Sequence, residues 1–338
     1  MENCFPSNLK ASSPNIFFYI RLKNVTLCIN IRLLLHTLGC PVLRGDRSME
    51  NLTQIRPLGD ALGAEVVEID LSQPLDNTVK VALTKAWNQY SVLVFRNQQL
   101  KPKEFLQFSK YFGELEVHVL DQYLHREYPE ILIVSNVLEG DRNIGIPDAG
   151  LYWHTDLSYM AAPSRGSILY AIEVPKSDGK SLGDTIWAST AAAYDALDID
   201  TKRQLSSMKA KFSLSGRFEK VADNEKADVE LTKDQINKAP DVIHPVVRTH
   251  PVTNRKCIFV NELHTSSIVG LPKTESQALL AELQEHTIQP EFVYQHSWLP
   301  GDVVMWDNVA TQHIAMHDYS LPQRRLMHRT TLTGDLPY

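Results

Sequence analysis

The feature that most limits how this chain can fold is a long series of short strand-like segments that begins after residue 150. The segments are apolar or alternating, and two helical patterns interrupt them, at residues 189–197 and 272–286. Many short strands with few helices are typical of a barrel or of a double-sheet jelly roll. We therefore expect a mainly β fold with flanking helices, a double-stranded β-helix or jelly roll, with strands at residues 167–174, 184–187, 210–215, 243–249, 256–260, 291–298, 302–306 and 325–332.

The chain before residue 150 mixes both kinds of element. Apolar residues at helical spacing predict helices at residues 78–90 and 102–112. Alternating or continuous apolar runs predict strands at residues 64–70, 91–95 and 130–134. A charged and weakly periodic segment, residues 219–240, indicates a mobile loop or lid.

The first 48 residues differ in composition from the rest of the chain. They carry six Lys or Arg residues and two Asp or Glu residues, although the whole chain has a net charge of −6. We interpret residues 1–48 as a non-catalytic N-terminal extension or as a wrongly assigned start, with Met49 as the real first residue. An organellar presequence is the alternative. We expect residues 49–338 to form a single domain.

Composition also limits the location and the partners of the protein. Cys257 is the only cysteine in residues 49–338, so this part cannot form an internal disulfide, which fits a reducing, cytoplasmic location. The negative net charge argues against a nucleic-acid partner. No apolar run approaches the roughly 20 residues that span a bilayer, so we expect no membrane partner.

The most informative segment is Leu-Tyr-Trp-His-Thr-Asp-Leu-Ser-Tyr at residues 151–159, where His154 and Asp156 interrupt an aromatic run. In a strand, side chains two positions apart point to the same face, so an imidazole and a carboxylate would converge. His313 is a candidate for a third ligand, with His317 as its rival. Two histidines and one carboxylate form the facial triad of non-heme Fe(II) oxygenases. The alternative is a hydrogen-bonded core histidine beside an unrelated carboxylate.

Two arginines follow in the last predicted strand. Alternation places Arg325 and Arg329 on one face with Met327, and His328 on the other face. Two guanidinium groups on the buried face of a strand would be costly without anions to meet them, and arginine matches a carboxylate bidentately. This pattern predicts a clamp for a dicarboxylate or a sulfonate beside the metal. The alternative is a pair of surface arginines on an edge strand.

With these motifs together, residues 53–336 resemble the taurine dioxygenase (TauD/TfdA) family of Fe(II)- and 2-oxoglutarate-dependent dioxygenases. The resemblance implies a jelly roll flanked by helices, as the strand pattern also predicts. Its motifs are Trp-His-Thr-Asp at 153–156, Gly-Asp-Thr-Ile-Trp at 183–187, Ile-Val-Gly-Leu-Pro at 268–272, Pro-Gly-Asp-Val-Val-Met-Trp-Asp-Asn at 300–308, Thr-Gln-His at 311–313 and Arg-Arg-Leu-Met-His-Arg at 324–329.

The resemblance also implies roles for single residues. Fe(II) would be bound by His154, Asp156 and His313, and 2-oxoglutarate by Thr185 and Arg325, while Arg329 and His118 would contact the substrate. The implied reaction uses dioxygen, hydroxylates a small anionic substrate such as a sulfonate, a sulfate ester or an aryloxy-alkanoate, and releases succinate and CO2. Family members often form dimers or tetramers, so the resemblance is compatible with a homo-oligomer, although the sequence does not indicate the oligomeric state. Residues 119–123 depart from the taurine enzymes, which argues against taurine itself.

Two other functions remain open from the residues alone. A zinc hydrolase could use the same triad with a bound water, but it would need a general base and gives no reason for the arginines. A non-catalytic jelly-roll binding protein would be expected to have lost a ligand, whereas every ligand position is filled.

Overall fold

The computed structural model describes residues 17–22, 25–30, 54–214 and 232–338. The chain divides into two units, Met1–Leu52 and Thr53–Tyr338. In the first unit, strands β1 (Phe17–Leu22) and β2 (Val25–Asn30) pair in antiparallel fashion. A domain boundary after residue 48, and the role of residues 1–48, stay predictions.

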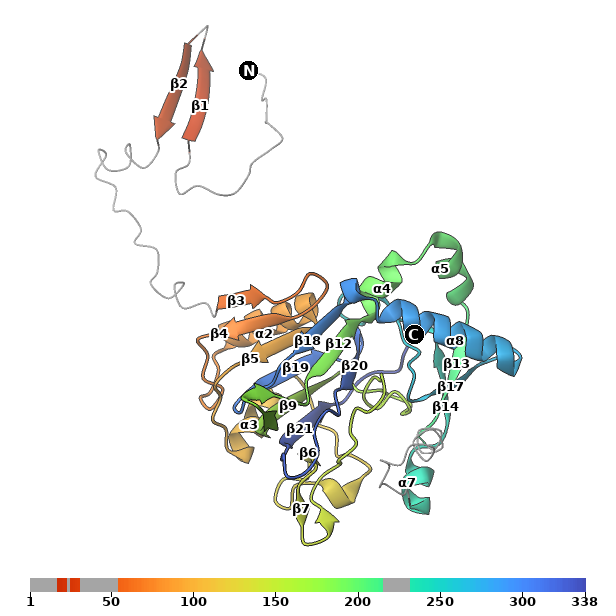
Figure 1. Cartoon of the computed structure of the whole chain (residues 1–338). Helices are drawn as coiled ribbons and strands as arrows, with labels where there is room; N and C mark the ends of the chain where they lie inside the picture. Colours follow the sequence, from red (N-terminus) through yellow and green to blue (C-terminus); the bar gives the residue numbers. More distant parts are fainter. Residues whose placement is uncertain (1–16, 23–24, 31–53, 215–231) are drawn as a thin grey trace. The chain divides into compact units, whose positions relative to one another are not determined.

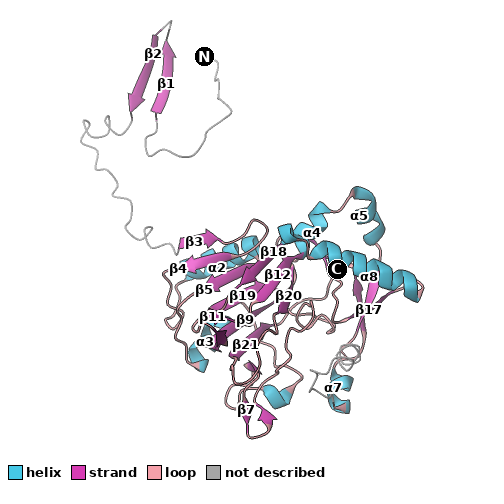
Figure 2. Ribbon diagram, viewed as in Figure 1, coloured by secondary structure: helices cyan, strands magenta, loops and turns pink. Residues whose placement is uncertain are grey.

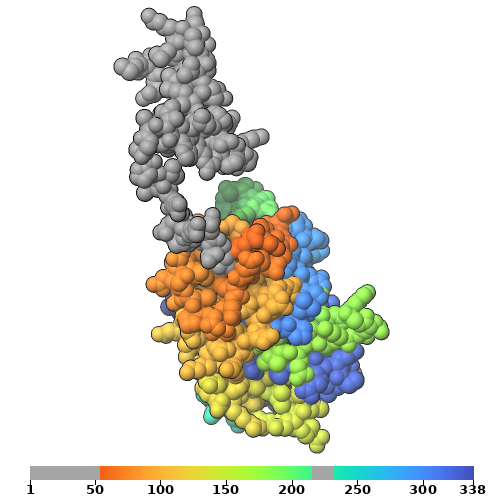
Figure 3. All heavy atoms as spheres, turned by 90° about the vertical axis from the view of Figure 1, so that its left-hand side faces the viewer, coloured from red at the N-terminus to blue at the C-terminus, as the bar shows by residue number. Residues whose placement is uncertain are grey.

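The main sheet of the second unit has seven strands in the order β3-β4-β5-β19-β9-β21-β6. All neighbouring strands run antiparallel except β4 and β5, which are parallel. Segments far apart in the sequence therefore lie side by side, as the adjacent orange and blue regions of Figure 3 show. The strands are β3 (Gln54–Pro57), β4 (Ala64–Val67), β5 (Val92–Phe95), β19 (Val303–Asp307), β9 (Gly166–Glu173), β21 (Leu326–Leu332) and β6 (Leu132–Ser135).

A second sheet faces the main one and consists of β18 (Val293–His296), β12 (Thr185–Ser189) and β20 (Thr311–Ala315). The two sheets enclose one apolar core, in which Trp187 of β12 packs on Trp306 of β19 with ring centroids 5.6 Å apart. Met327 of β21 and Trp298, after β18, belong to the same core. This is the double-sheet, jelly-roll arrangement that the strand pattern predicts.

The opposite face of the main sheet is covered by helices α2 (Asn77–Tyr90) and α3 (Pro102–Ser109). Alternation along β5 separates the two layers: Val92 and Val94 point into the core between the sheets, whereas Leu93 and Phe95 contact the helices. Figures 1 and 2 show the strands in the middle of this unit and the helices around them.

A smaller layer completes the unit, with its own apolar core. Its main elements are the sheet β14-β13-β17, the pair β15-β16 and the long helix α8. The bounds are α4 (Thr190–Ala196), α5 (Ile199–Leu205), β13 (Lys209–Phe212), α7 (Lys233–Lys238), β14 (Val242–Pro245), β15 (Val247–Thr249), β16 (Lys256–Ile258), β17 (Thr265–Ile268) and α8 (Lys273–Thr287). Two hairpins are formed by strands of two residues each: β7 (Leu138–Glu139) pairs with β8 (Arg142–Asn143), and β10 (Lys176–Ser177) pairs with β11 (Lys180–Ser181). The short 3-10 helices are η2 (Asp121–Tyr123) and η3 (Pro290–Phe292).

The structure corrects several of the predicted elements. Residues 243–249 form two strands, β14 and β15, instead of one, and residues 291–298 begin with the 3-10 helix η3 before β18. The predicted loop at 219–240 contains helix α7, and its residues 219–231 lie outside the described part of the chain. Strand β20 was not predicted, because Thr-Gln-His-Ile-Ala has no clear alternation although it is almost entirely buried.

Candidate metal centre

Backbone pairing brings His154 and His313 together. The amide of each residue donates to the carbonyl oxygen of the other, with N–O distances of 3.0 and 2.8 Å, so the two imidazoles stand side by side with centroids 4.1 Å apart. Gly150 makes this close approach possible. It has φ +84°, and a Cβ at this position would lie 3.0 Å from the Cβ of Ala315 on β20.

Asp156 reaches the same point from a turn and not from a strand. The strand geometry that would place His154 and Asp156 on one face is present only at His154, where the segment pairs before it turns, with Leu157 at φ 54°. The hydroxyl of Thr155 donates to the carbonyl oxygen of Thr311 at 3.0 Å and fixes the turn against β20. The expected convergence of imidazole and carboxylate is nevertheless present.

His154, Asp156 and His313 each offer one ligand atom, and these atoms lie within 4.8 Å of one another. Oδ1 of Asp156 is 3.6 Å from Nε2 of His154, and Oδ2 is 4.0 Å from Nε2 of His313. Nδ1 of His154 bonds to the carbonyl oxygen of Tyr152 at 2.9 Å, which assigns the proton to Nδ1 and leaves the Nε2 lone pair for a metal. This buried donor set fits a divalent first-row metal such as Fe(II).

The surroundings hold His313 and Asp156 in the protonation states that a metal requires. Burial, and next the neighbouring His154, keep the pKa of the His313 imidazole well below its ordinary value, so the ring is neutral at pH 7. Burial alone would raise the pKa of Asp156, but the Arg329 guanidinium and then the His154 ring hold it well below its ordinary value. Arg329 donates to Oδ1 of Asp156 at 2.8 Å.

The predicted 2-oxoglutarate residues line one cavity next to the triad. Thr185 on β12, Arg325 just before β21 and His313 all contribute to its wall. Gly183, at φ +74°, allows this packing, because a Cβ there would lie 2.9 Å from Tyr319 and 3.4 Å from Nε of Arg325. Arg325 is 3% exposed and its Nε has no hydrogen-bond partner. Indole Nε1 of Trp298 donates to the Thr185 hydroxyl oxygen at 2.9 Å, which leaves the hydroxyl proton for another acceptor.

The predicted substrate residues line a second cavity, which also borders the triad. His118 and Arg329 lie in its wall with the apolar side chains of Leu157 and Leu263. Arg329 lines both cavities, and its Nε is buried without a hydrogen-bond partner. As predicted, His328 lies on the opposite face of β21, where its ring packs against His125 at 5.6 Å.

Sequence reasoning missed several residues of the site. Trp298, Ser167 and His264 were given no role, although Trp298 contacts Thr185, Ser167 donates to Asp156 at 2.6 Å and His264 lines the second cavity. Strand periodicity could have shown Ser167 to be inward-facing, but not its partner. His317, the rival of His313, lies beyond β20, stacks on Tyr319 at 6.1 Å and is not part of the triad.

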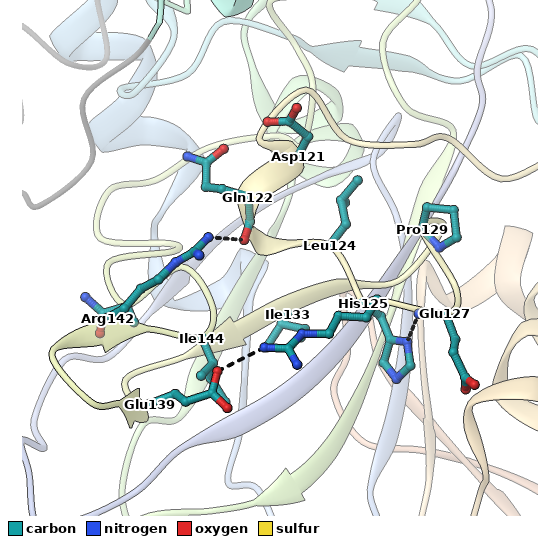
Figure 4. Close-up of a pocket in the computed structure, with 12 residues that line it drawn as sticks. Asp121, Gln122, Leu124, His125, Glu127, Pro129, Ile133, Glu139, Arg142 and Ile144 are labelled. Carbon is teal, nitrogen blue, oxygen red and sulfur yellow. Dashed lines mark hydrogen bonds and ion pairs between the residues drawn. The ribbon is translucent and has the colours of Figure 1, made fainter.

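A larger groove lies away from the triad, between η2 and the β7–β8 hairpin, with a volume of about 800 Å³. Figure 4 shows that Glu139 and Arg142 each bond to a neighbouring side chain or to the backbone. Arg126 donates to Glu139 at 3.0 Å, and Arg142 donates to the carbonyl oxygen of Gln122 at 3.3 Å. None of the predicted site residues lies in this groove.

No helix among the residues that the structure describes is long and apolar enough to cross a membrane.

Known proteins resemble the chain over most of its length. The family model of taurine catabolism dioxygenase TauD, TfdA family, matches residues 54–331. Pentalenolactone F synthase of Streptomyces arenae is 33% identical, over 84% of this chain and 96% of the relative. Alpha-ketoglutarate-dependent 2,4-dichlorophenoxyacetate dioxygenase of Cupriavidus pinatubonensis is 36% identical, over 82% of this chain and 97% of the relative. The crystal structure of AAD-2 in complex with Mn(II) and N-oxalylglycine superimposes with a TM-score of 0.70 and 31% identity, over 84% of this chain and 98% of AAD-2.

The family model covers well over half of the chain, and it matches the part that contains both sheets and the triad. The alpha-ketoglutarate named for the relative is 2-oxoglutarate. The chain therefore belongs to the TauD/TfdA family, and it is an Fe(II)- and 2-oxoglutarate-dependent dioxygenase.

Proposed function

We propose that His154, Asp156 and His313 bind the Fe(II), that Thr185 and Arg325 bind 2-oxoglutarate beside it, and that the enzyme hydroxylates a small organic anion. The observation that carries the proposal is the excess of buried positive charge around the triad. Arg325 and Arg329 are 3% and 8% exposed, whereas Asp156 is the only carboxylate in the walls of the two cavities among the described residues.

The first cavity suits the co-substrate. A guanidinium without an acidic partner matches the distal carboxylate of 2-oxoglutarate, and its planar donors fix the orientation of that carboxylate. The Thr185 hydroxyl, whose oxygen already accepts from Trp298, is oriented to donate to the same molecule. Thr185 is oriented by Trp298 and Arg325 is confined by burial, so little side-chain entropy is lost when the co-substrate arrives.

The bound iron would supply activation of dioxygen, which couples decarboxylation of 2-oxoglutarate to succinate and CO2 with hydroxylation of the substrate. The protein positions the substrate for that step. Arg329 offers a buried donor to an anionic group, and Leu157, Tyr159 and Leu263 offer apolar surface to the body of the molecule. A sulfonate, a sulfate ester or an aryloxy-alkanoate fits this combination.

Taurine fits the second cavity less well, because its ammonium group would need an acceptor there. The only wall carboxylate among the described residues is Asp156, which already accepts from Arg329 and Ser167. We propose, therefore, that the substrate carries an anionic group without a cationic amine. The relative named for 2,4-dichlorophenoxyacetate supports an aryloxy-alkanoate as the first compound to test.

A substrate panel tests the proposal. Protein with Fe(II), 2-oxoglutarate and oxygen would be given phenoxyacetate, an alkyl sulfate, an alkanesulfonate or taurine, and succinate would be measured. We expect at least one of phenoxyacetate, the alkyl sulfate and the alkanesulfonate to release succinate faster than taurine does and faster than the reaction without substrate. Release with taurine alone would contradict the substrate class, and no release with a wider panel of organic anions would contradict the proposed reaction.

The two alternatives from the sequence have no support in the site. A zinc hydrolase leaves the unpaired Arg325 without a purpose, and a degenerate binding protein would not keep all three ligands converged. A cytoplasmic location, the absence of nucleic-acid and membrane partners and a homo-oligomeric state stay predictions.

A further inference from the structure

The carboxylate of Asp156 is held by a chain of hydrogen-bonded, buried side chains that has no assigned contact with the metal or the substrate. The hydroxyl of Ser167 bonds to Oδ2 of Asp156 at 2.6 Å, and Ser167 is fully buried on β9. Behind it, Nδ2 of Asn308 lies 3.0 Å from the Ser167 hydroxyl oxygen, and Nε1 of Trp306 lies 2.9 Å from Oδ1 of Asn308.

The direction of every hydrogen bond in this chain is determined. An indole N–H can only donate, so Oδ1 of Asn308 is the acceptor and its Nδ2 must face the two serines. Nδ2 carries two protons and donates to both Ser164, at 2.9 Å, and Ser167. The Ser167 hydroxyl oxygen thus accepts from Asn308, and its single proton points to Asp156.

We infer that Ser167, supported by Asn308 and Trp306, is a positioning residue that fixes the Asp156 carboxylate for the metal. The inference rests on the proposed role of Asp156 as a metal ligand. Arg329 holds one oxygen of the carboxylate and Ser167 holds the other, so its plane cannot turn about the Cβ–Cγ bond without breaking a buried hydrogen bond. Partners of this kind orient ligands and set metal affinity.

The inference gives a physical role to the Trp-Asp-Asn motif at residues 306–308. Ser167 alone links the motif to the ligand, and it lies 11 residues after Asp156 and 141 residues before Asn308. Ser164 is a branch of the same network without a bond to the ligand. It accepts from Asn308 and donates to the carbonyl oxygen of Gly166 at 3.0 Å.

Ser164 therefore provides the matched control for Ser167. Mn(II) would be titrated into full-length protein, and its dissociation constant and its electron paramagnetic resonance spectrum would be measured for the wild type, Ser167→Ala, Ser167→Cys and Ser164→Ala. Loss of the Ser167 hydroxyl should weaken Mn(II) binding by about 10- to 100-fold and change the spectrum of the bound ion. Ser167→Cys keeps a side chain of similar size with a weaker donor, so its dissociation constant should lie between those of the wild type and Ser167→Ala. Ser164→Ala should stay within threefold of the wild type.

The outcomes separate this inference from the proposed metal centre. Wild-type affinity and spectrum in both Ser167 variants would overturn the inference, and so would an equal loss in Ser164→Ala, which would indicate general loosening of the core. If the wild type bound no Mn(II), or if Asp156→Ala bound it equally well, the metal centre itself would be wrong. Thermal unfolding of the metal-free variants checks that each one folds.

Discussion

Replacing Arg325 with Met should make the protein more stable and at the same time impair its reaction. The Arg325 guanidinium is 3% exposed, and it forms no ion pair with any carboxylate of the described residues. Its one favourable contact of note is with the Tyr319 ring, whose centroid lies 5.9 Å from Cζ. An unpaired buried cation of this kind is costly for the ligand-free fold and useful for binding an anion.

The loss of function can be estimated from the contact that 2-oxoglutarate would lose. A hydrogen bond to a charged group contributes about 1.5–3 kcal/mol, which corresponds to a roughly 10- to 150-fold higher KM for 2-oxoglutarate. The gain in stability should be at least about 1 kcal/mol, because desolvation of a single buried ion costs several kcal/mol and the contact with Tyr319 is worth less than that. For a protein of this size we expect Tm to rise by about 2 °C or more.

Arg324 is the matched control, since it is the adjacent residue of the same type. It is exposed and bonds to both oxygens of Glu173 at 2.8 and 3.0 Å. Arg324→Met should leave the KM for 2-oxoglutarate unchanged and change Tm little, because an exposed ion pair contributes little to stability. The assays are succinate release at varied 2-oxoglutarate concentration, and thermal unfolding without metal or co-substrate. A KM within twofold of the wild type in Arg325→Met would refute the assigned role, and a lower Tm would show that the guanidinium has a structural partner.

Three further predictions concern single side chains, and a fourth concerns residues 1–48. His154→Ala should abolish Mn(II) binding and succinate release, and turnover in this variant would exclude His154 as a ligand. Trp298→Phe removes the donor to Thr185, so the KM for 2-oxoglutarate should rise about 2- to 10-fold, the equivalent of one neutral hydrogen bond; an unchanged KM would mean that the Thr185 hydroxyl is not oriented by this bond. Burial, and next His125, lower the pKa of His328 to about 4. As the pH drops from about 6.5 toward 4, the unfolded chain is protonated at this residue before the folded chain, so the free energy of unfolding falls by roughly 2 kcal/mol between pH 7 and pH 5. Urea titrations at both pH values should show a smaller fall in His328→Phe. A chain that begins at Met49 should bind Mn(II) and turn over like the full-length protein, and loss of either would contradict the predicted dispensability of residues 1–48.

The sequence predicted that His154, Asp156 and His313 converge, partly for a wrong reason. His154 and Asp156 were expected to converge through strand alternation, but Asp156 lies in a turn, and it is the backbone pairing of His154 with His313 that brings the three side chains together. The two-residue spacing of His154 and Asp156 was informative because His154 does form a β-bridge with His313. Arg325 and Arg329 were placed on one face by the same alternation; Arg329 lies in β21 and Arg325 directly precedes it, and both line the first cavity.

The contacts that orient the site could not be predicted, because they depend on the register between strands. Trp298 meets Thr185 across 113 residues, and Asn308 meets Ser167 across 141. Each of these residues looks like an ordinary core side chain in its own segment. Only the pairing of β12 with β18 and of β19 with β9 decides which polar atoms meet.

The charges around the triad bear on which substrate completes the site. Arg325 and Arg329 are buried cations, Asp156 is ionised, and His313 is held neutral, so the protein groups together carry one positive charge before a metal binds. A divalent metal raises this to three, and such a charge is costly in a buried site. The dianion 2-oxoglutarate removes two charges, and a substrate with one negative charge removes the last. A zwitterion such as taurine would leave one charge uncompensated, so the proposed substrate is a monoanion, for which binding of metal, co-substrate and substrate should be mutually favourable.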